Sequence, residues 1–175
     1  MARRPTALRE IPAPSPAPRR RAPQQALPAY RFVPGLNPHP FRHEGGHLYT
    51  DGGAPAEHPS PPLEPWTEDL RWLYALDLFD HRYLWEAHEA WEALWHQVPR
   101  HTPESALLQA LIQAAAGLLK LHMGEIEAAS RLLERAQLRL ESAEEGLGPR
   151  PHGLNLPEFR AGLGFAIVGG PWPFL

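Results

Sequence analysis

A histidine and several carboxylates lie among tryptophans in residues 85–96 of the chain. Wound as a helix at about 100° per residue, this stretch brings a histidine and a glutamate onto the aromatic face. The face consists of Leu84, His88, Trp91, Glu92 and Trp95, with Trp85 at its margin. Unpaired polar groups on an apolar face carry a desolvation cost. The stretch therefore predicts either a functional site or a buried polar network.

His88 and Glu92 are one helical turn apart, so both side chains can reach one ion or one water molecule. Asp77 lies on an apolar face of the preceding predicted helix and is expected to meet them. One imidazole and two carboxylates suit a divalent metal ion such as zinc or manganese, with coordination positions left open. They also suit a histidine that a carboxylate orients as a general base. We take His88, Glu92 and Asp77 as the candidate metal ligands.

Other side chains are expected to border this site and to bind a small substrate. Gln113 and Lys120 lie on a polar line of the third predicted helix and can supply hydrogen bonds or a cation. Trp85 borders the aromatic face, and His39 is held between two prolines. Glu86 lies nearly opposite the histidine on the helix, so we expect it to face solvent or a neighbouring helix.

Residues 66–148 are expected to be helical, because only Pro99 and Pro103 of the 22 prolines lie within them. Apolar periodicity, N-cap residues and proline positions predict helices at about residues 67–79, 83–97, 103–122, 125–144 and 158–165. Short connections make consecutive helices antiparallel neighbours. The predicted fold is an all-α antiparallel bundle of four main helices, with a short C-terminal helix and a long proline-rich irregular N-terminal arm.

Composition divides the chain into four parts. Residues 1–29 are rich in proline, alanine and arginine and are expected to be disordered or to form polyproline II. Residues 30–65 read as an irregular strap and linker, residues 66–165 as the helical domain, and residues 166–175 as an apolar tail. A free apolar tail is a liability, so we expect it to pack on the bundle or on a second copy of the chain in a homo-oligomer.

The strap has two interpretations. In the first, it lies across the domain and delivers His39 or His47 to the site. In the second, which the sequence favours, it is held by the apolar anchors Phe32, Phe41 and Tyr49 while its histidines are solvated. The spacing of the histidines matches no metal-binding template unless it is helical, and the prolines and glycines of the strap oppose a helix.

Several classes of function are excluded or disfavoured by composition. The chain has no cysteine, which excludes disulfides, thiolate zinc sites and cysteine nucleophiles. The net charge of −3 conceals a basic stretch, residues 1–31. We interpret it as a solvated tail rather than a nucleic-acid-binding arm, because no aromatic side chain precedes Tyr30. No signal-peptide pattern and no run of ~20 apolar residues is present, so a cytoplasmic protein without a membrane span is expected.

Residues 66–145 resemble the domain-of-unknown-function family numbered 309. Three motifs carry the resemblance: Asp77-Leu78-Phe79-Asp80, Trp85-Glu86-Ala87-His88-Glu89-Ala90-Trp91-Glu92-Ala93-Leu94-Trp95, and Leu111-Ile112-Gln113. Asp80 replaces the usual asparagine, and Ala110 stands where glycine is common. The resemblance implies a helical bundle and a motif centred on His88, Glu89 and Glu92, which we take as the candidate catalytic residues. It implies no established activity.

Two hypotheses of function follow. The first is a metal-dependent hydrolase with a His/Glu/Asp pocket between the helices. The second is a non-catalytic interaction or scaffold module, in which the same residues form a structural polar network that fixes the register of the helices. The convergence of Asp77, His88 and Glu92 on an open cavity would favour the first hypothesis.

Overall fold

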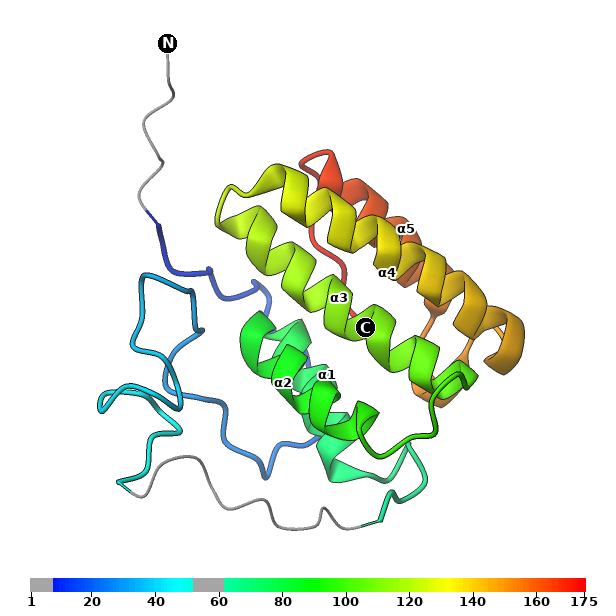
Figure 1. Ribbon diagram of the computed structural model, residues 1–175, viewed down its shortest axis with the longest axis horizontal. Coiled ribbons are helices and arrows are strands. Elements are labelled where there is room, and N and C mark those ends of the chain that lie inside the picture. The colour runs from blue at the N-terminus through cyan, green and yellow to red at the C-terminus, as the bar shows by residue number, and fades with distance from the viewer. Residues whose placement is uncertain (1–7, 52–61) are drawn as a thin grey trace.

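A computed structural model describes residues 8–51 and 62–175, and their regular structure is entirely helical (Figure 1). The helices are α1 (Leu70–Asp80), α2 (Leu84–Trp95), α3 (Pro103–His122), α4 (Ile126–Leu147) and α5 (Leu156–Ile167), with the short 3-10 helix η1 (Pro151–Gly153) before α5. This arrangement confirms the all-α fold. None of the described helices is both long enough and apolar enough to cross a membrane.

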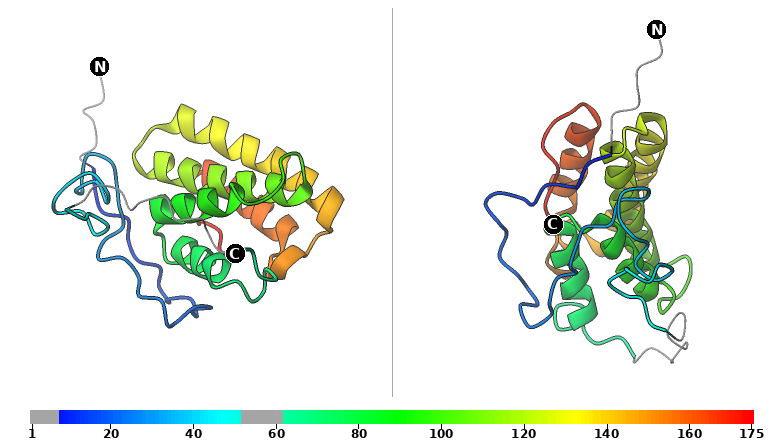
Figure 2. Two further views of the ribbon diagram at one scale, coloured as in Figure 1. Left: turned by 60° about the horizontal axis from the view of Figure 1, so that its bottom comes forward. Right: turned by 90° about the vertical axis from the view of Figure 1, so that its left-hand side faces the viewer.

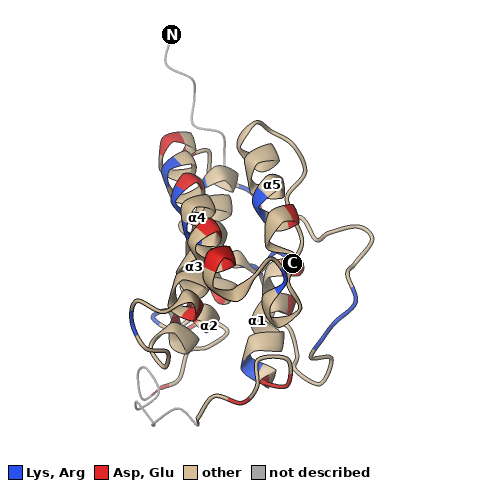
Figure 3. Cartoon of the chain, turned by 90° about the vertical axis from the view of Figure 1, so that its right-hand side faces the viewer, with Lys and Arg blue, Asp and Glu red and all other residues tan. Residues whose placement is uncertain are grey.

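The two longest helices, α3 and α4, form the centre of the bundle and run side by side (Figures 1 and 2). Helix α2 packs on α3, α1 packs on α2, and α5 packs on α4. The close approach of α3 to α4 depends on Gly117, because a Cβ atom there would lie 2.7 Å from the side chain of Leu133. This glycine thus allows the close spacing of the two helices, and α4 carries acidic and basic residues along its length (Figure 3).

Side-chain caps fix the starts of three helices. Thr102 accepts a hydrogen bond from the backbone N–H of Ser105 ahead of Pro103, as the sequence predicts, and Asn155 caps α5 by accepting from the N–H of Glu158. The first helix begins later than expected. Asp69, rather than Thr67, is its N-cap and accepts from the N–H of Arg71. The carboxylate of Asp69 also binds the guanidinium of Arg71. This second contact favours Asp69 over Thr67 as the N-cap.

The N-terminal arm differs from the expectation of disorder over residues 8–29, which pack against the helical domain (Figure 2). Ile11 is 2 % exposed and joins the core, and Ala22 is fully buried. The physical reason is that two arginines of this arm bind buried carboxylates of α1, as described below. Residues 1–7 lie outside the described part of the chain.

The strap has no regular secondary structure over residues 30–51, and residues 52–61 lie outside the described part. Phe32 and Val33 are buried against the domain, whereas Tyr49 is exposed. The apolar tail packs on the bundle of its own chain, because Arg82 donates hydrogen bonds to the carbonyl oxygens of Pro173 and Trp172. The apolar anchors therefore include Phe32 but not Tyr49.

Candidate metal centre

Helix α2 brings together His88, Glu89 and Glu92. One ligating atom from each lies within 4.8 Å of the other two, and the Nδ1 atom of His88 lies 3.3 Å from a carboxylate oxygen of Glu89. Neighbouring ligands around one ion are about 3 to 4 Å apart at the usual bond lengths. The three side chains can therefore coordinate one divalent ion after small rotamer changes.

The position of this cluster on the helix differs from the expectation that it lies inside the aromatic face. Trp91 is fully buried, but the side chain of His88 is 28 % exposed and that of Glu89 is 37 % exposed. The cluster therefore lies at the margin of the buried face and is partly exposed to solvent. Both Glu89, indicated by the family motif, and Glu92, indicated by helical phasing, belong to it.

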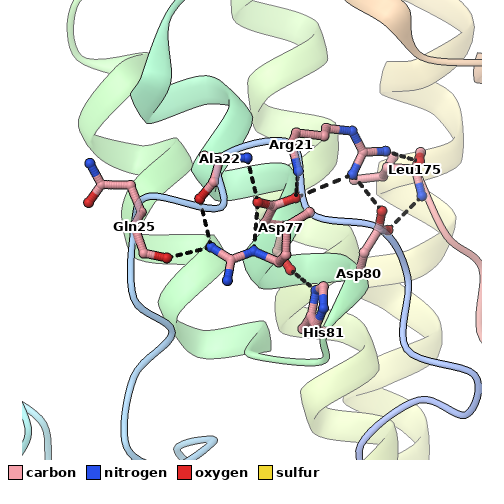
Figure 4. A network of polar contacts seen from close by, with 8 residues as sticks. Arg21, Ala22, Gln25, Asp77, Asp80, His81 and Leu175 are labelled. Atoms are coloured by element: carbon pink, nitrogen blue, oxygen red, sulfur yellow. Dashed lines mark hydrogen bonds and ion pairs between the residues drawn. The ribbon is translucent and has the colours of Figure 1, made fainter.

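Asp77 does not join the cluster, although the sequence suggested it as a metal ligand. Its fully buried carboxylate accepts hydrogen bonds from Nε of Arg20 at 2.8 Å and from the backbone N–H groups of Arg21 at 2.7 Å and Ala22 at 2.8 Å (Figure 4). Burial by itself raises the pKa of this carboxyl, but these hydrogen bonds outweigh burial and hold the pKa below its ordinary value. Asp77 thus binds the N-terminal arm as a carboxylate.

Asp80, one turn later in α1, joins the arm to the C-terminal tail. It accepts a hydrogen bond from Nη1 of Arg21 at 2.8 Å and another from the backbone N–H of Leu175 at 2.8 Å (Figure 4). Arg21 also donates to the carbonyl oxygen of Leu175. The two acids of the Asp77-Leu78-Phe79-Asp80 motif therefore hold two remote segments of the chain against α1.

The predicted substrate-binding residues separate into two groups. His39 and Trp85 meet, with ring centroids 5.6 Å apart, one turn before His88 on α2. The Nε1 atom of Trp95 donates to Oγ of Ser105 at 2.9 Å, which joins the end of α2 to the first turn of α3.

Gln113 and Lys120 of α3 form the second group and differ in their polar contacts. The Oε1 atom of Gln113 is buried without a hydrogen-bond partner among the described residues. Lys120 lies near the C-terminal end of α3 and forms an ion pair with Glu125 at 2.9 Å. The cation of Lys120 is therefore already paired, whereas the amide oxygen of Gln113 is not.

Glu86 faces neither solvent nor a neighbouring helix, contrary to the expectation from phasing. It is 6 % exposed beneath the strap, where its Oε1 atom accepts from the backbone N–H of Phe32 at 3.1 Å and lies 3.6 Å from Nε2 of His47. Burial raises the pKa of Glu86 to about 7 and lowers that of His47. Sequence reasoning missed this pair, because the strap carries no periodic pattern that would align it with α2.

The fold and the cluster define a small all-helical domain whose second helix carries a His-Glu-x-x-Glu set. Residues 72–132 match the family model described as domain of unknown function (DUF309), so this chain carries a DUF309 domain. The match extends from α1 into the first part of α4 and confirms the family that the motifs indicate. Searches of curated proteins and of solved structures found no match.

Proposed function

We propose that the DUF309 domain of this chain binds a divalent metal ion, zinc or manganese, through His88, Glu89 and Glu92. The observation that carries the proposal is the convergence of one imidazole and two carboxylates within 4.8 Å at an accessible margin of α2. Oxygen and nitrogen ligands of this kind suit both ions. Asp77 is not part of this ligand set, because its carboxylate is occupied by the N-terminal arm.

We further propose that the bound ion serves the hydrolysis of a small substrate. A bound divalent ion supplies Lewis acidity and lowers the pKa of a coordinated water. Three ligands from one helix leave coordination positions open for such a water. Gln113 and the aromatic pair of His39 and Trp85 are the residues that we assign to substrate binding, since the aromatic pair lies one turn before His88 on α2 and the Oε1 atom of Gln113 has no hydrogen-bond partner among the described residues.

Metal binding is tested with protein that carries no histidine tag. Wild type is expected to hold one ion per chain by elemental analysis and to gain thermal stability from added zinc or manganese, about 2.7 kcal/mol at a metal concentration 100 times Kd. His88→Ala, Glu89→Gln and Glu92→Gln are expected to lose this gain. Glu134→Gln, an exposed change on α4, is the control and should behave as wild type. No stoichiometric ion and no stabilisation of wild type would contradict the proposal.

The second candidate function is a non-catalytic interaction module. Its premise of a structural polar network is supported by Asp77 and Asp80, motif acids whose carboxylates bind the chain's own terminal segments. In that case His88 and Glu89 simply pair with each other, at 3.3 Å. The same experiment separates the two functions. A purely structural cluster predicts that His88→Ala lowers the stability of the domain by the same amount with and without added metal.

A further inference from the structure

A pocket of about 460 Å³ lies where the end of α2 and the α2–α3 loop meet the first turns of α3 and the later half of α4. Its volume lies within the range of small-molecule sites, roughly 300 to 1,000 Å³. The residues that matter for its chemistry are Trp95, Arg100, His101, Ser105, Gln109 and Arg139. None of them belongs to the proposed metal site, so a ligand in this pocket would bind separately from the metal ion.

All the ionisable side chains that line this pocket are basic. Arg100, His101 and Arg139 line it, and within residues 8–51 and 62–175 no carboxylate lines it and none forms an ion pair with these three side chains. Two acids of the adjoining α4, Glu141 and Glu144, are paired with Arg160 of α5. The pocket is thus a concave site with uncompensated positive charge, which favours an anion.

Both guanidinium groups are oriented by neighbouring side chains. Arg139 donates from one Nη atom to the Oε1 atom of Gln109, which ties it to α3. The guanidinium carbon of Arg100 lies 5.0 Å from the ring centroid of Trp95, in a cation–π contact. These contacts use only part of the donor capacity of each group, since a guanidinium carries five N–H donors. The other donors can bind oxygen atoms of a ligand.

A buried hydroxyl adds a neutral donor to the two cations. Ser105 is 4 % exposed, and its Oγ atom accepts a hydrogen bond from Nε1 of Trp95 at 2.9 Å. The hydroxyl proton of Ser105 is therefore directed away from the indole, and no described group accepts it. A ligand oxygen in the pocket would complete the hydrogen bonding of this side chain.

We propose that this pocket binds the phosphomonoester group of a small molecule. Guanidinium groups bind phosphate oxygens with paired, charge-assisted hydrogen bonds. Two arginines, an imidazole and a hydroxyl offer more donors than the two oxygens of a carboxylate can use, whereas the three terminal oxygens of a phosphomonoester match them. The volume leaves room for the organic part of the ligand. This site goes beyond the proposed metal centre and needs no metal ion.

The test is a calorimetric titration of the full-length chain with glycerol 2-phosphate, in chloride buffer that contains a chelator. Wild type is expected to show one saturable site, and acetate is expected to bind at least about tenfold more weakly. Arg139→Met and Arg100→Met should each weaken binding of glycerol 2-phosphate by about tenfold or more, the usual effect of losing a charge-assisted hydrogen bond. The chelator makes the outcome independent of the metal centre.

The matched control is Arg135→Met, which removes the same charge from an exposed position one turn earlier on α4, outside the pocket. It should keep wild-type affinity. If Arg135→Met and Arg139→Met weaken the binding of glycerol 2-phosphate equally, binding depends on the overall charge of the protein and not on this pocket, and the proposal is wrong. The absence of saturable binding by wild type would also overturn it. If Arg139→Met loses helical circular dichroism, Arg100→Met decides, because Arg100 is exposed in a loop.

Discussion

Asp77→Ala is expected to lower the free energy of unfolding by about 3 to 5 kcal/mol, the usual result of removing one partner from a buried charged network. The carboxylate is fully buried and accepts from the guanidinium of Arg20 and from two backbone N–H groups. Its loss leaves these donors without a partner in the interior. Urea denaturation followed by circular dichroism at neutral pH measures the change.

The same variant should also release the N-terminal arm. Trypsin is expected to cleave after Arg19, Arg20 or Arg21 faster in Asp77→Ala than in wild type, because this part of the arm is bound to α1 through the carboxylates of Asp77 and Asp80. Glu134→Ala, on the exposed face of α4, is the control and should change stability by no more than about 0.5 kcal/mol. Unchanged stability together with unchanged cleavage in Asp77→Ala would show that the arm does not depend on this contact.

The helices and the His88 cluster could be predicted because both depend on local spacing. The cap at Thr102 with Pro103 is a signal within two residues, and His88 and Glu92 are neighbours on any helix that contains them. Consecutive residues of a helix point about 100° apart, yet the side chain of Glu89 reaches the same cluster as that of His88. A long side chain spans such an arc through its rotamers, so helical phasing separates carboxylates less sharply than it separates Cβ positions.

The partner of Asp77 could not be predicted from local spacing, because Arg20 lies 57 residues away in the sequence. One signal was available in the chain. Asp77 has no lysine or arginine within four residues, so a buried carboxylate at this position must find its cation elsewhere, and residues 1–31 hold the main concentration of arginine. Proline-rich composition masked this signal, since it predicts disorder for a segment whose order comes from contacts rather than from its own propensity.

The position of Glu86 shows a second limit of phasing. A residue opposite a buried helical face is expected to be solvated only if nothing else covers that side of the helix. Here the strap covers it: the backbone N–H of Phe32 donates to the carboxylate of Glu86, and Nε2 of His47 lies 3.6 Å from it. The strap is irregular, so no periodic pattern in the sequence marks where it meets α2. The carboxyl group is consequently buried where the helix pattern predicts water.

Glu86→Gln is expected to stabilise the protein at pH 8 but not at pH 4.5, with a difference of about 3 kcal/mol between these conditions. Burial raises the pKa of Glu86 from 4.5 to about 7, which corresponds to about 3 kcal/mol of lost stability once the carboxylate is ionised. Below pH 4.5 the group is protonated in both the folded and the unfolded states and has no effect. Between pH 4.5 and 7 the folded state binds more protons, so the stability of wild type falls as the pH rises. Glutamine stays neutral throughout.

Urea denaturation at pH 4.5, 6, 7 and 8, in buffers that contain a chelator, measures the difference between wild type and Glu86→Gln. His47 contributes to the pH dependence of stability with the opposite sign, because burial lowers its pKa. Its contribution is separated by comparing His47→Gln with the double variant His47→Gln/Glu86→Gln, which should reproduce the same pH-dependent gain. A stability difference that stays constant from pH 4.5 to 8 would mean that Glu86 is already ionised in the folded protein at acidic pH. In that case the 3.6 Å contact with His47 would be an ion pair that offsets the burial of the carboxylate.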